Sequence, residues 1–330
     1  MDRHRALAAL ALGIATAIGG GSGGAALPAT ARPPVPVLRE MRWIDPGLSR
    51  ADVIRLLTTE PAECLITATL PEASNQIAIG RAAFRSPLLL GGQAARAGIS
   101  CASCHRAGHG NPNFAFPGVS GAPGTADVTS SLFSRKRGDG LANPRPIPDL
   151  TSDRAKIDRD PASPALRHFI RGLVVDEFDG LEMSDPVLDG LVAYVRALGG
   201  ACSGDIARSA SQEVDTAIAT AGAAKHSLAI LDVPTAHLLI GAARSALGRI
   251  DERYAVVPGI DRRLDARDSE LRRVQVMAVS DPGAAAMALD WWTASFSRDI
   301  AALRKAEGRS LYSAAVLEKT LAIRPQLAPQ

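Results

Sequence analysis

The chain has 330 residues and is poor in cysteine, in aromatic side chains and in net charge. Its four cysteines are too few for a small disulfide-rich scaffold. An aromatic content of 4% leaves aliphatic side chains, alanine above all, to fill the core. The formal net charge of +3 is too small to favour nucleic acid as a partner. The length predicts two compact units.

Beyond the first thirty residues the sequence also lacks a hydrophobic run long enough to span a membrane. Residues 2–5 (Asp-Arg-His-Arg) have a net positive charge, residues 6–18 are apolar, and residues 29–31 read Ala-Thr-Ala, which matches a cleavage site. We therefore expect residues 1–31 to be a secretory signal peptide and the mature protein to be periplasmic, without a stable membrane span. An uncleaved anchor is the alternative.

The sequence does contain a succession of helical patterns. Apolar spacing predicts helices at residues 49–57, 75–84, 165–174, 187–198, 206–229, 235–254, 262–279, 284–305 and 311–323. Residues 110–150 are rich in Gly, Pro, Asn and Ser and predict a long irregular loop. The expected fold class is therefore all-α, with a leader and short helix (32–72), a first helical domain (73–202) and an antiparallel helical bundle (203–330).

One short motif carries most of the chemistry. Residues 101–105 read Cys101-Ala102-Ser103-Cys104-His105, the C-x-x-C-H signature for covalent attachment of haem. Each thiol adds to one vinyl group of the porphyrin, and the histidine supplies a nitrogen ligand to iron. A thioredoxin-like redox pair is an alternative that needs a βαβ context, and a zinc site is another that needs a second ligand pair nearby. We expect one covalently attached haem c.

The residues around this motif resemble a class I c-type cytochrome domain. The resemblance rests on residues 79–84, on the motif itself and on residues 191–198. It implies that the first and last helices of the domain cross beside the haem. Gly80 would permit the close crossing, and Phe84 would pack near Tyr194.

A longer pattern is similar to the first haem domain of bacterial cytochrome c peroxidases. It comprises residues 84–88, the Ser100-Cys101 pair and residues 143–150. Those peroxidases carry two C-x-x-C-H sites, whereas this chain has one. The resemblance therefore implies a single haem in this chain, without the second haem of those peroxidases.

The resemblance also implies a methionine as the sixth iron ligand, taken from the loop before the last helix. Met183 precedes the predicted helix start at Ser184 and is the candidate. A thioether ligand favours ferrous iron. His168, on a predicted helix, is the runner-up, and His109 is disfavoured because it follows His105 closely. A five-coordinate iron is the remaining alternative and would favour peroxide chemistry.

The other two cysteines, Cys64 and Cys202, flank the first helical domain. The expected compartment is oxidising, so we predict that they form a disulfide, with two unrelated buried thiols as the alternative.

Several further residues are weaker candidates. Haem propionates need donors, for which Arg135, Arg137 and Arg145 are available in the long loop. The acidic residues between 176 and 179 are expected to be a solvated face. A second haem in the bundle would have to use His226, His237, Met277 or Met287, and Trp291 and Trp292 are expected to pack in the core or at an interface.

The leading functional hypothesis is a periplasmic mono-haem c-type cytochrome that transfers electrons to or from a redox partner protein, whose identity the sequence does not reveal. A peroxidase-like haem enzyme or haem subunit of an oxidoreductase is the first alternative. A haem-bearing sensor or binding module is the second.

Overall fold

The structure is a computed structural model that describes residues 38–66, 71–155, 157–199, 202 and 204–323. Most of these residues are helical, which confirms the all-α prediction. The expected signal peptide (1–31) and the proline-rich start of the leader lie outside the described residues. None of the helices described is long and apolar enough to cross a membrane.

The chain before the motif forms short helices and one strand. In order these are η1 (Arg39–Trp43), α1 (Arg50–Thr58), β1 (Thr59–Pro61), α2 (Pro71–Phe84), η2 (Pro87–Leu89) and α3 (Gly92–Ala97). Ser49 caps α1, because its hydroxyl oxygen accepts a hydrogen bond from the backbone N–H of Asp52 at 3.2 Å. The sequence pattern did not reveal η1.

The chain from the motif to Cys202 contains further short elements. These are α4 (Cys101–Cys104), β2 (His105–Arg106), β3 (His109–Gly110), β4 (Thr125–Ala126), β5 (Arg145–Pro146), η3 (Asp153–Ala155), α5 (Ala165–Gly172), the π-helical turn η4 (Leu173–Glu177) and α6 (Asp185–Ala197). The stretch from 110 to 150 contains no helix, which agrees with the predicted loop. Its strands are two residues long and pair β2 with β3 and β4 with β5.

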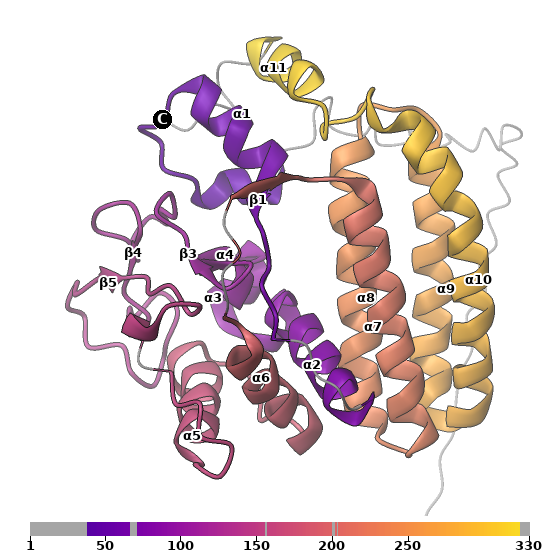
Figure 1. Cartoon of the computed structure of the whole chain (residues 1–330), viewed down its shortest axis with the longest axis horizontal. Helices are drawn as coiled ribbons and strands as arrows, with labels where there is room; N and C mark the ends of the chain where they lie inside the picture. The colour runs from indigo at the N-terminus through magenta and orange to yellow at the C-terminus, as the bar shows by residue number, and fades with distance from the viewer. Residues whose placement is uncertain (1–37, 67–70, 156, 200–201, 203, 324–330) are drawn as a thin grey trace, which may run out of the picture. The chain divides into compact units, whose positions relative to one another are not determined.

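Helices α2 and α6 cross at a point where their backbones touch (Figure 1). A Cβ atom at Gly80 would lie 1.9 Å from the carbonyl oxygen of Gly190, so only glycine fits there. The Phe84 and Tyr194 rings pack beside this crossing with their centroids 5.1 Å apart. The close crossing and the aromatic contact expected from the sequence are therefore both present.

The chain after Cys202 begins with β6 (Asp205–Ala207) and continues with α7 (Ala210–Ala229), α8 (Val233–Tyr254), α9 (Ile260–Ser280), α10 (Pro282–Glu307) and α11 (Ala314–Ile323). Helices α7 to α10 pack as a four-helix bundle joined by short turns, so consecutive helices run antiparallel (Figure 1). The prediction of helix from residue 206 was wrong at its start, because residues 205–207 pair antiparallel with β1 instead. Ser209 then caps α7.

The bundle packs against the elements around the motif. The Ser184 and Thr235 hydroxyl groups are hydrogen-bonded at 2.6 Å, which ties the start of α6 to α8. The Leu88 side chain reaches α8 at Gly241, where a Cβ atom would lie 2.7 Å from Leu88 Cδ1. The glycine therefore makes room for the leucine.

A small second core lies apart from the main one and joins the two ends of the described chain. It contains Leu38, Ile44, Val53, Leu56, Leu57, Leu311, Leu317 and Leu321. The leader and α1 thus bury their apolar side chains against α11 rather than forming a separate unit.

Candidate cofactor attachment site

The first four residues of the C-x-x-C-H motif form a single helical turn, α4, whose start is set by local contacts, and His105 directly follows this turn. Helix α3 ends at Gly98, which has a φ of 79°, and this left-handed residue reverses the chain. The Ser103 hydroxyl accepts a hydrogen bond from the backbone N–H of Ser100 at 3.1 Å and stabilises the turn. At 100° per residue, Cys101, Cys104 and His105 share one side of this turn, and Ala102 and Ser103 take the other.

The His105 ring is held by a backbone carbonyl distant in sequence. Its Nδ1 lies 3.0 Å from the carbonyl oxygen of Pro148, to which the Nδ1–H donates. This hydrogen bond orients the ring and leaves Nε2 as the free nitrogen. Burial lowers the pKa of His105 to about 4, although Pro148 and Asp149 oppose the shift, so the imidazole is neutral and able to bind a metal ion.

The long loop places Pro148 beside the motif through its own short pairings. Strands β4 and β5 bring residue 146 back toward residue 125, and the N–H of Ile147 donates to the Gly124 carbonyl at 2.9 Å. On the other side, β2 and β3 form a tight hairpin whose turn residues Ala107 and Gly108 have φ values of 51° and 88°. The loop thus has a definite role, which is to supply the partner of His105.

The two motif cysteines are free thiols that are partly buried. Burial raises the pKa of Cys101 to about 12 and raises that of Cys104 as well. Phe84 stands beside the motif, with its ring centroid 6.3 Å from that of His105. Two thiols and one imidazole therefore share a half-buried, apolar position at the end of α2, and this set fits the attachment of a porphyrin and its iron.

The residues considered as sixth ligands lie in different settings. Met183 is partly buried and packs against the main apolar core, in which Cys101 and Cys104 also take part. His168 is exposed on α5, next to Phe169, which is 64% exposed. This exposure makes His168 a poor candidate for the sixth ligand, because α5 buries other side chains and leaves His168 in solvent.

His109 is engaged at both ring nitrogens. Its Nδ1 lies 3.1 Å from an Asp149 carboxylate oxygen, and its Nε2 lies 3.3 Å from the Ala62 carbonyl oxygen. Burial alone would raise the pKa of Asp149, but hydrogen bonds from Thr151 and His109 lower it below its usual value. The role of His109 is therefore structural, and it has no free nitrogen for iron.

Cys64 and Cys202 are joined by a disulfide with their Cα atoms 5.7 Å apart. The bond continues a ladder formed by β1 and β6 and by a backbone bridge between Leu65 and Leu198. The pair that the sequence led us to expect thus ties the chain ahead of α2 to the chain beyond α6.

The three loop arginines are exposed, and two of them have acidic partners. Arg135 bonds Asp179 at 2.8 Å, Arg137 lies 3.5 Å from Glu177, and Arg145 is exposed on β5. The expectation of a solvated acidic face was wrong for Asp179, whose side chain is only 5% exposed because Arg135 and the loop cover it.

The bundle offers no clear second cofactor site. His226 and His237 are exposed, and Met287 is 69% exposed. Trp292 is buried, as predicted, and its indole N–H donates to the Arg267 carbonyl at 3.1 Å. The expectation was wrong for Trp291, which is 57% exposed on the opposite side of α10.

The alternatives to haem attachment gain no support from the described part of the chain. Its strands pair only in antiparallel, two-stranded sheets, whereas a thioredoxin-like pair needs a parallel βαβ unit. Within the same residues no group of three or more His, Cys, Asp and Glu side chains could hold a metal ion, as a zinc site would require.

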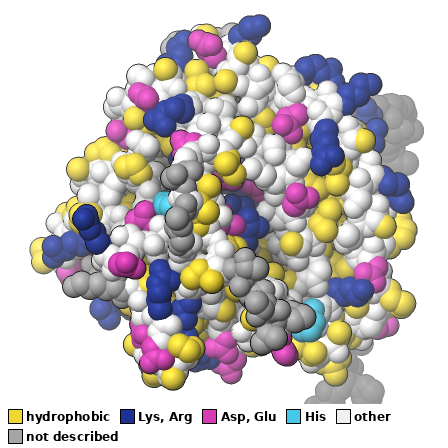
Figure 2. Space-filling view, in the orientation of Figure 1, with side chains coloured by type: hydrophobic (Ala, Val, Ile, Leu, Met, Phe, Trp, Pro, Cys, Tyr) yellow, Lys and Arg dark blue, Asp and Glu magenta, His cyan; other side chains and the backbone are white. Residues whose placement is uncertain are grey.

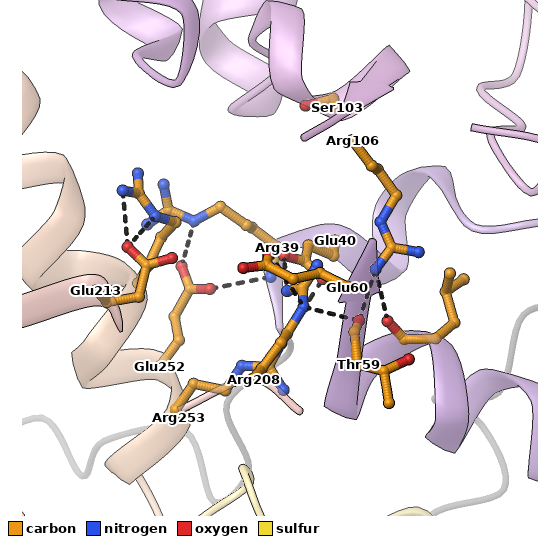
Figure 3. A network of polar contacts seen from close by, with 12 residues as sticks. Arg39, Glu40, Thr59, Glu60, Ser103, Arg106, Arg208, Glu213, Glu252 and Arg253 are labelled. Carbon is orange, nitrogen blue, oxygen red and sulfur yellow. Dashed lines mark hydrogen bonds and ion pairs between the residues drawn. The ribbon is translucent and has the colours of Figure 1, made fainter. Parts of the chain in front are cut away.

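The sequence reasoning missed a network of charged side chains behind the motif (Figure 3). Its members come from η1, from β1, from the residue after α2, from β2, from the residue after β6 and from the bundle. They are Arg39, Glu40, Glu60, Arg85, Arg106, Arg208, Glu213, Arg249, Glu252 and Arg253. No spacing in the sequence marks these residues, because they meet only in the fold. On the face shown in Figure 2, by contrast, basic and acidic side chains are interspersed.

Comparisons of the chain with protein-family models, with curated proteins and with solved structures found no match in any of the three.

Proposed function

We propose that this protein is a mono-haem c-type cytochrome that transfers electrons, with a class I-like domain around the C-x-x-C-H motif. The observation that carries the proposal is the setting of His105, whose Nδ1 lies 3.0 Å from the Pro148 carbonyl oxygen while Cys101 and Cys104 share its side of α4. A neutral imidazole with one nitrogen held by the backbone and the other free is what an axial ligand requires.

The chain's own residues have separable tasks in this function. The Cys101 and Cys104 thiols would hold the porphyrin, each by adding its S–H across one vinyl group with nothing released. His105 would bind iron through Nε2, and the Pro148 carbonyl holds the ring in place. The haem supplies a one-electron ferric/ferrous couple, and burial and ligand choice set its potential.

Met183 is proposed as the sixth ligand. It lies in the segment directly before α6, it is partly buried, and it packs against the main core in which both motif cysteines take part. His168 and His109 are poorer candidates, since the first is exposed and the second is bonded at both nitrogens.

We further propose that the protein works in the periplasm with a redox partner protein. The disulfide between Cys64 and Cys202 supports an oxidising compartment, where such bonds persist. Residues 1–31 match a signal peptide in sequence and lie outside the described residues.

Mass spectrometry of the full chain, matured in a host that attaches haem c, tests the attachment. We expect the mass of one haem on the wild-type chain and none on the Cys101→Ser/Cys104→Ser variant. The matched control is Cys64→Ser/Cys202→Ser, which changes two cysteines outside the motif and should keep the haem. A bare wild-type chain would refute the proposal.

Optical spectroscopy and voltammetry test the electron-transfer function. We expect a low-spin ferric spectrum and a reversible one-electron couple, and Met183→Ala should convert the iron to high spin and lower the potential. An unchanged Met183→Ala spectrum would remove Met183 from the ligand set. Turnover of peroxide with a reduced cytochrome donor would instead favour the peroxidase-like alternative.

A further inference from the structure

A cavity of about 100 Å³ lies behind the motif, on the side away from the cysteines. The motif contributes Ala102 and Ser103 to its wall, and Arg106 follows. Cys101, Cys104 and His105 are not among the described residues that line it, which agrees with the helical turn placing them on the opposite side. The cavity is therefore distinct from the proposed haem position.

Side chains of the charged network form part of the walls of the cavity, beside apolar residues such as Trp43 and Leu56 (Figure 3). Most of the charged side chains of the network form ion pairs. Arg39 pairs with Glu252 at 2.7 Å, Arg208 with Glu40 at 2.5 Å and Arg249 with Glu213 at 2.9 Å. Two longer contacts join Arg253 to Glu40 at 3.7 Å and Arg208 to Glu60 at 3.8 Å. Within this set, six arginines face four glutamates. Two positive charges are left uncompensated.

The two arginines without a carboxylate partner are Arg85 and Arg106, and both line the cavity. Arg106 donates to the backbone carbonyls of Leu56 and Thr59 at 3.1 and 2.7 Å. The Arg85 backbone N–H donates to the Arg81 carbonyl, but its side chain forms no hydrogen bond or ion pair among the described residues. Burial opposes the charge of Arg85, and Glu213, Glu60 and Glu63 raise its pKa from longer range.

The carboxylates just outside the network do not supply the missing charge. Glu63 bonds Arg81 at 2.6 Å and so belongs to a neutral pair. Asp205 shares Arg55 with Asp52, does not line the cavity and acts on Arg106 only from longer range. The Thr59 carbonyl accepts from both Arg106 and Arg208, at 2.7 and 3.1 Å, which brings two guanidinium groups together (Figure 3). Uncompensated charge in such a recess has a large desolvation cost unless a counter-ion binds.

We propose that this cavity is a binding site for a small divalent oxyanion of the inorganic phosphate type, held by Arg85 and Arg106. Guanidinium groups bind tetrahedral oxyanions through paired N–H donors, and a dianion matches the excess of two charges. Arg39 and Glu40, whose side chains are 21% and 28% exposed, lie at the solvent side and leave a route for a small ion.

The volume of the cavity limits the size of the ligand that it can hold. One water needs roughly 10–15 Å³ of such space, so about 100 Å³ is sufficient for a tetrahedral oxyanion with a few waters. It is well below the roughly 300–1,000 Å³ of pockets that enclose larger organic ligands. The site is therefore expected to take free phosphate in preference to a nucleotide. It does not depend on the haem proposal, because its residues lie on the other side of α4.

The test is titration of the full chain with inorganic phosphate at constant ionic strength, followed by calorimetry and by the midpoint of thermal unfolding. We expect saturable binding that raises the midpoint. Arg85→Gln should weaken this binding at least about tenfold, since it removes charge-assisted hydrogen bonds. It should lower the phosphate-free midpoint only slightly, because the Arg85 side chain donates no hydrogen bond to a described residue and acts on Glu213 only from longer range.

Two further variants sharpen the result. Arg85→Lys keeps the charge and should retain binding, although more weakly. Arg272→Gln removes a positive charge from the exposed face of α9, where the side chain is 68% exposed, and should bind phosphate as the wild type does. Binding that is absent in the wild type, or equally tight in Arg85→Gln, would overturn the proposal. Equal affinity for a nucleoside monophosphate would overturn the assignment of ligand size.

Discussion

The chain up to Cys202 and the bundle that follows it are stabilised in different ways. In the first region the helices are short, and a few specific contacts hold them: one glycine crossing, one disulfide and one histidine–carbonyl bond. The bundle consists of helices of 20 to 26 residues that pack along their whole length. Single contacts should therefore matter more in the first region, whereas the bundle spreads its stability over many side chains.

Removal of the disulfide should have the largest effect and should be confined to the first region. The bond closes a loop over 138 residues, for which loop-closure entropy gives a stabilisation of about 4–5 kcal/mol. We expect Cys64→Ser/Cys202→Ser to lower the free energy of unfolding by that order, measured by urea denaturation. Hydrogen exchange should quicken in α2 and α6 and stay slow in α7 to α10. Equal loss of protection in both regions would contradict the comparison.

The glycine crossing should come next. At Gly80 a Cβ would lie 1.9 Å from the Gly190 carbonyl oxygen, so α2 and α6 would have to separate. We expect Gly80→Ala to cost about 3 kcal/mol in urea denaturation.

The matched control for this change lies in the bundle, where a Cβ at Gly222 would have no neighbour within 4 Å. Gly222→Ala in α7 should stabilise the protein by about 0.5–1 kcal/mol, because alanine favours helix. Equal effects of the two substitutions would contradict the close crossing.

The ion pairs of the charged network should make the free energy of unfolding depend on pH. Burial alone would raise the pKa of Glu213, but Arg249 and Arg85 lower it from 4.5 to about 2. The folded state thus binds a proton less readily than the unfolded chain, so this stabilisation is complete above about pH 4.5 and is lost as the pH falls toward 2.

Glu213→Gln should flatten this part of the curve of unfolding free energy against pH. At neutral pH it should cost about 2 kcal/mol, since Arg249 loses its partner. The control Asp290→Asn breaks an ion pair with Lys225 in which both side chains are about half exposed, and should cost less than about 0.5 kcal/mol. If the unfolding free energy of Glu213→Gln still falls steeply at low pH, other carboxylates cause the acid dependence.

The smallest effect should come from the hydroxyl pair that connects α6 to α8. Thr235 is fully buried and bonds Ser184 at 2.6 Å. Thr235→Val should lower the free energy of unfolding by about 1 kcal/mol. Ser297→Ala, which removes a hydroxyl bonded at 2.8 Å to its own exposed helix, is the control and should change little. A cost below that of the control would show that the two regions do not depend on this bond.

Local signals in the sequence predicted much of the helical structure. The Ser49 cap, the prolines that begin α8 and α10, and the apolar spacing of the helices are all encoded within a few residues. The exceptions were segments that depend on distant partners. Residues 205–207 read as helix in isolation but form a strand because β1 lies beside them.

The candidate site divides in the same way. The sequence alone identified the motif cysteines and His105, since their spacing is itself the chemical signature, and it singled out Gly80 and the Cys64–Cys202 pair. Only the tertiary structure revealed that Pro148, 43 residues beyond His105, accepts its Nδ1–H, that His109 is bonded at both nitrogens, and that arginines from distant segments surround a cavity. Capping and periodicity act between near neighbours and can be read along the chain, whereas these contacts depend on how the elements pack in three dimensions.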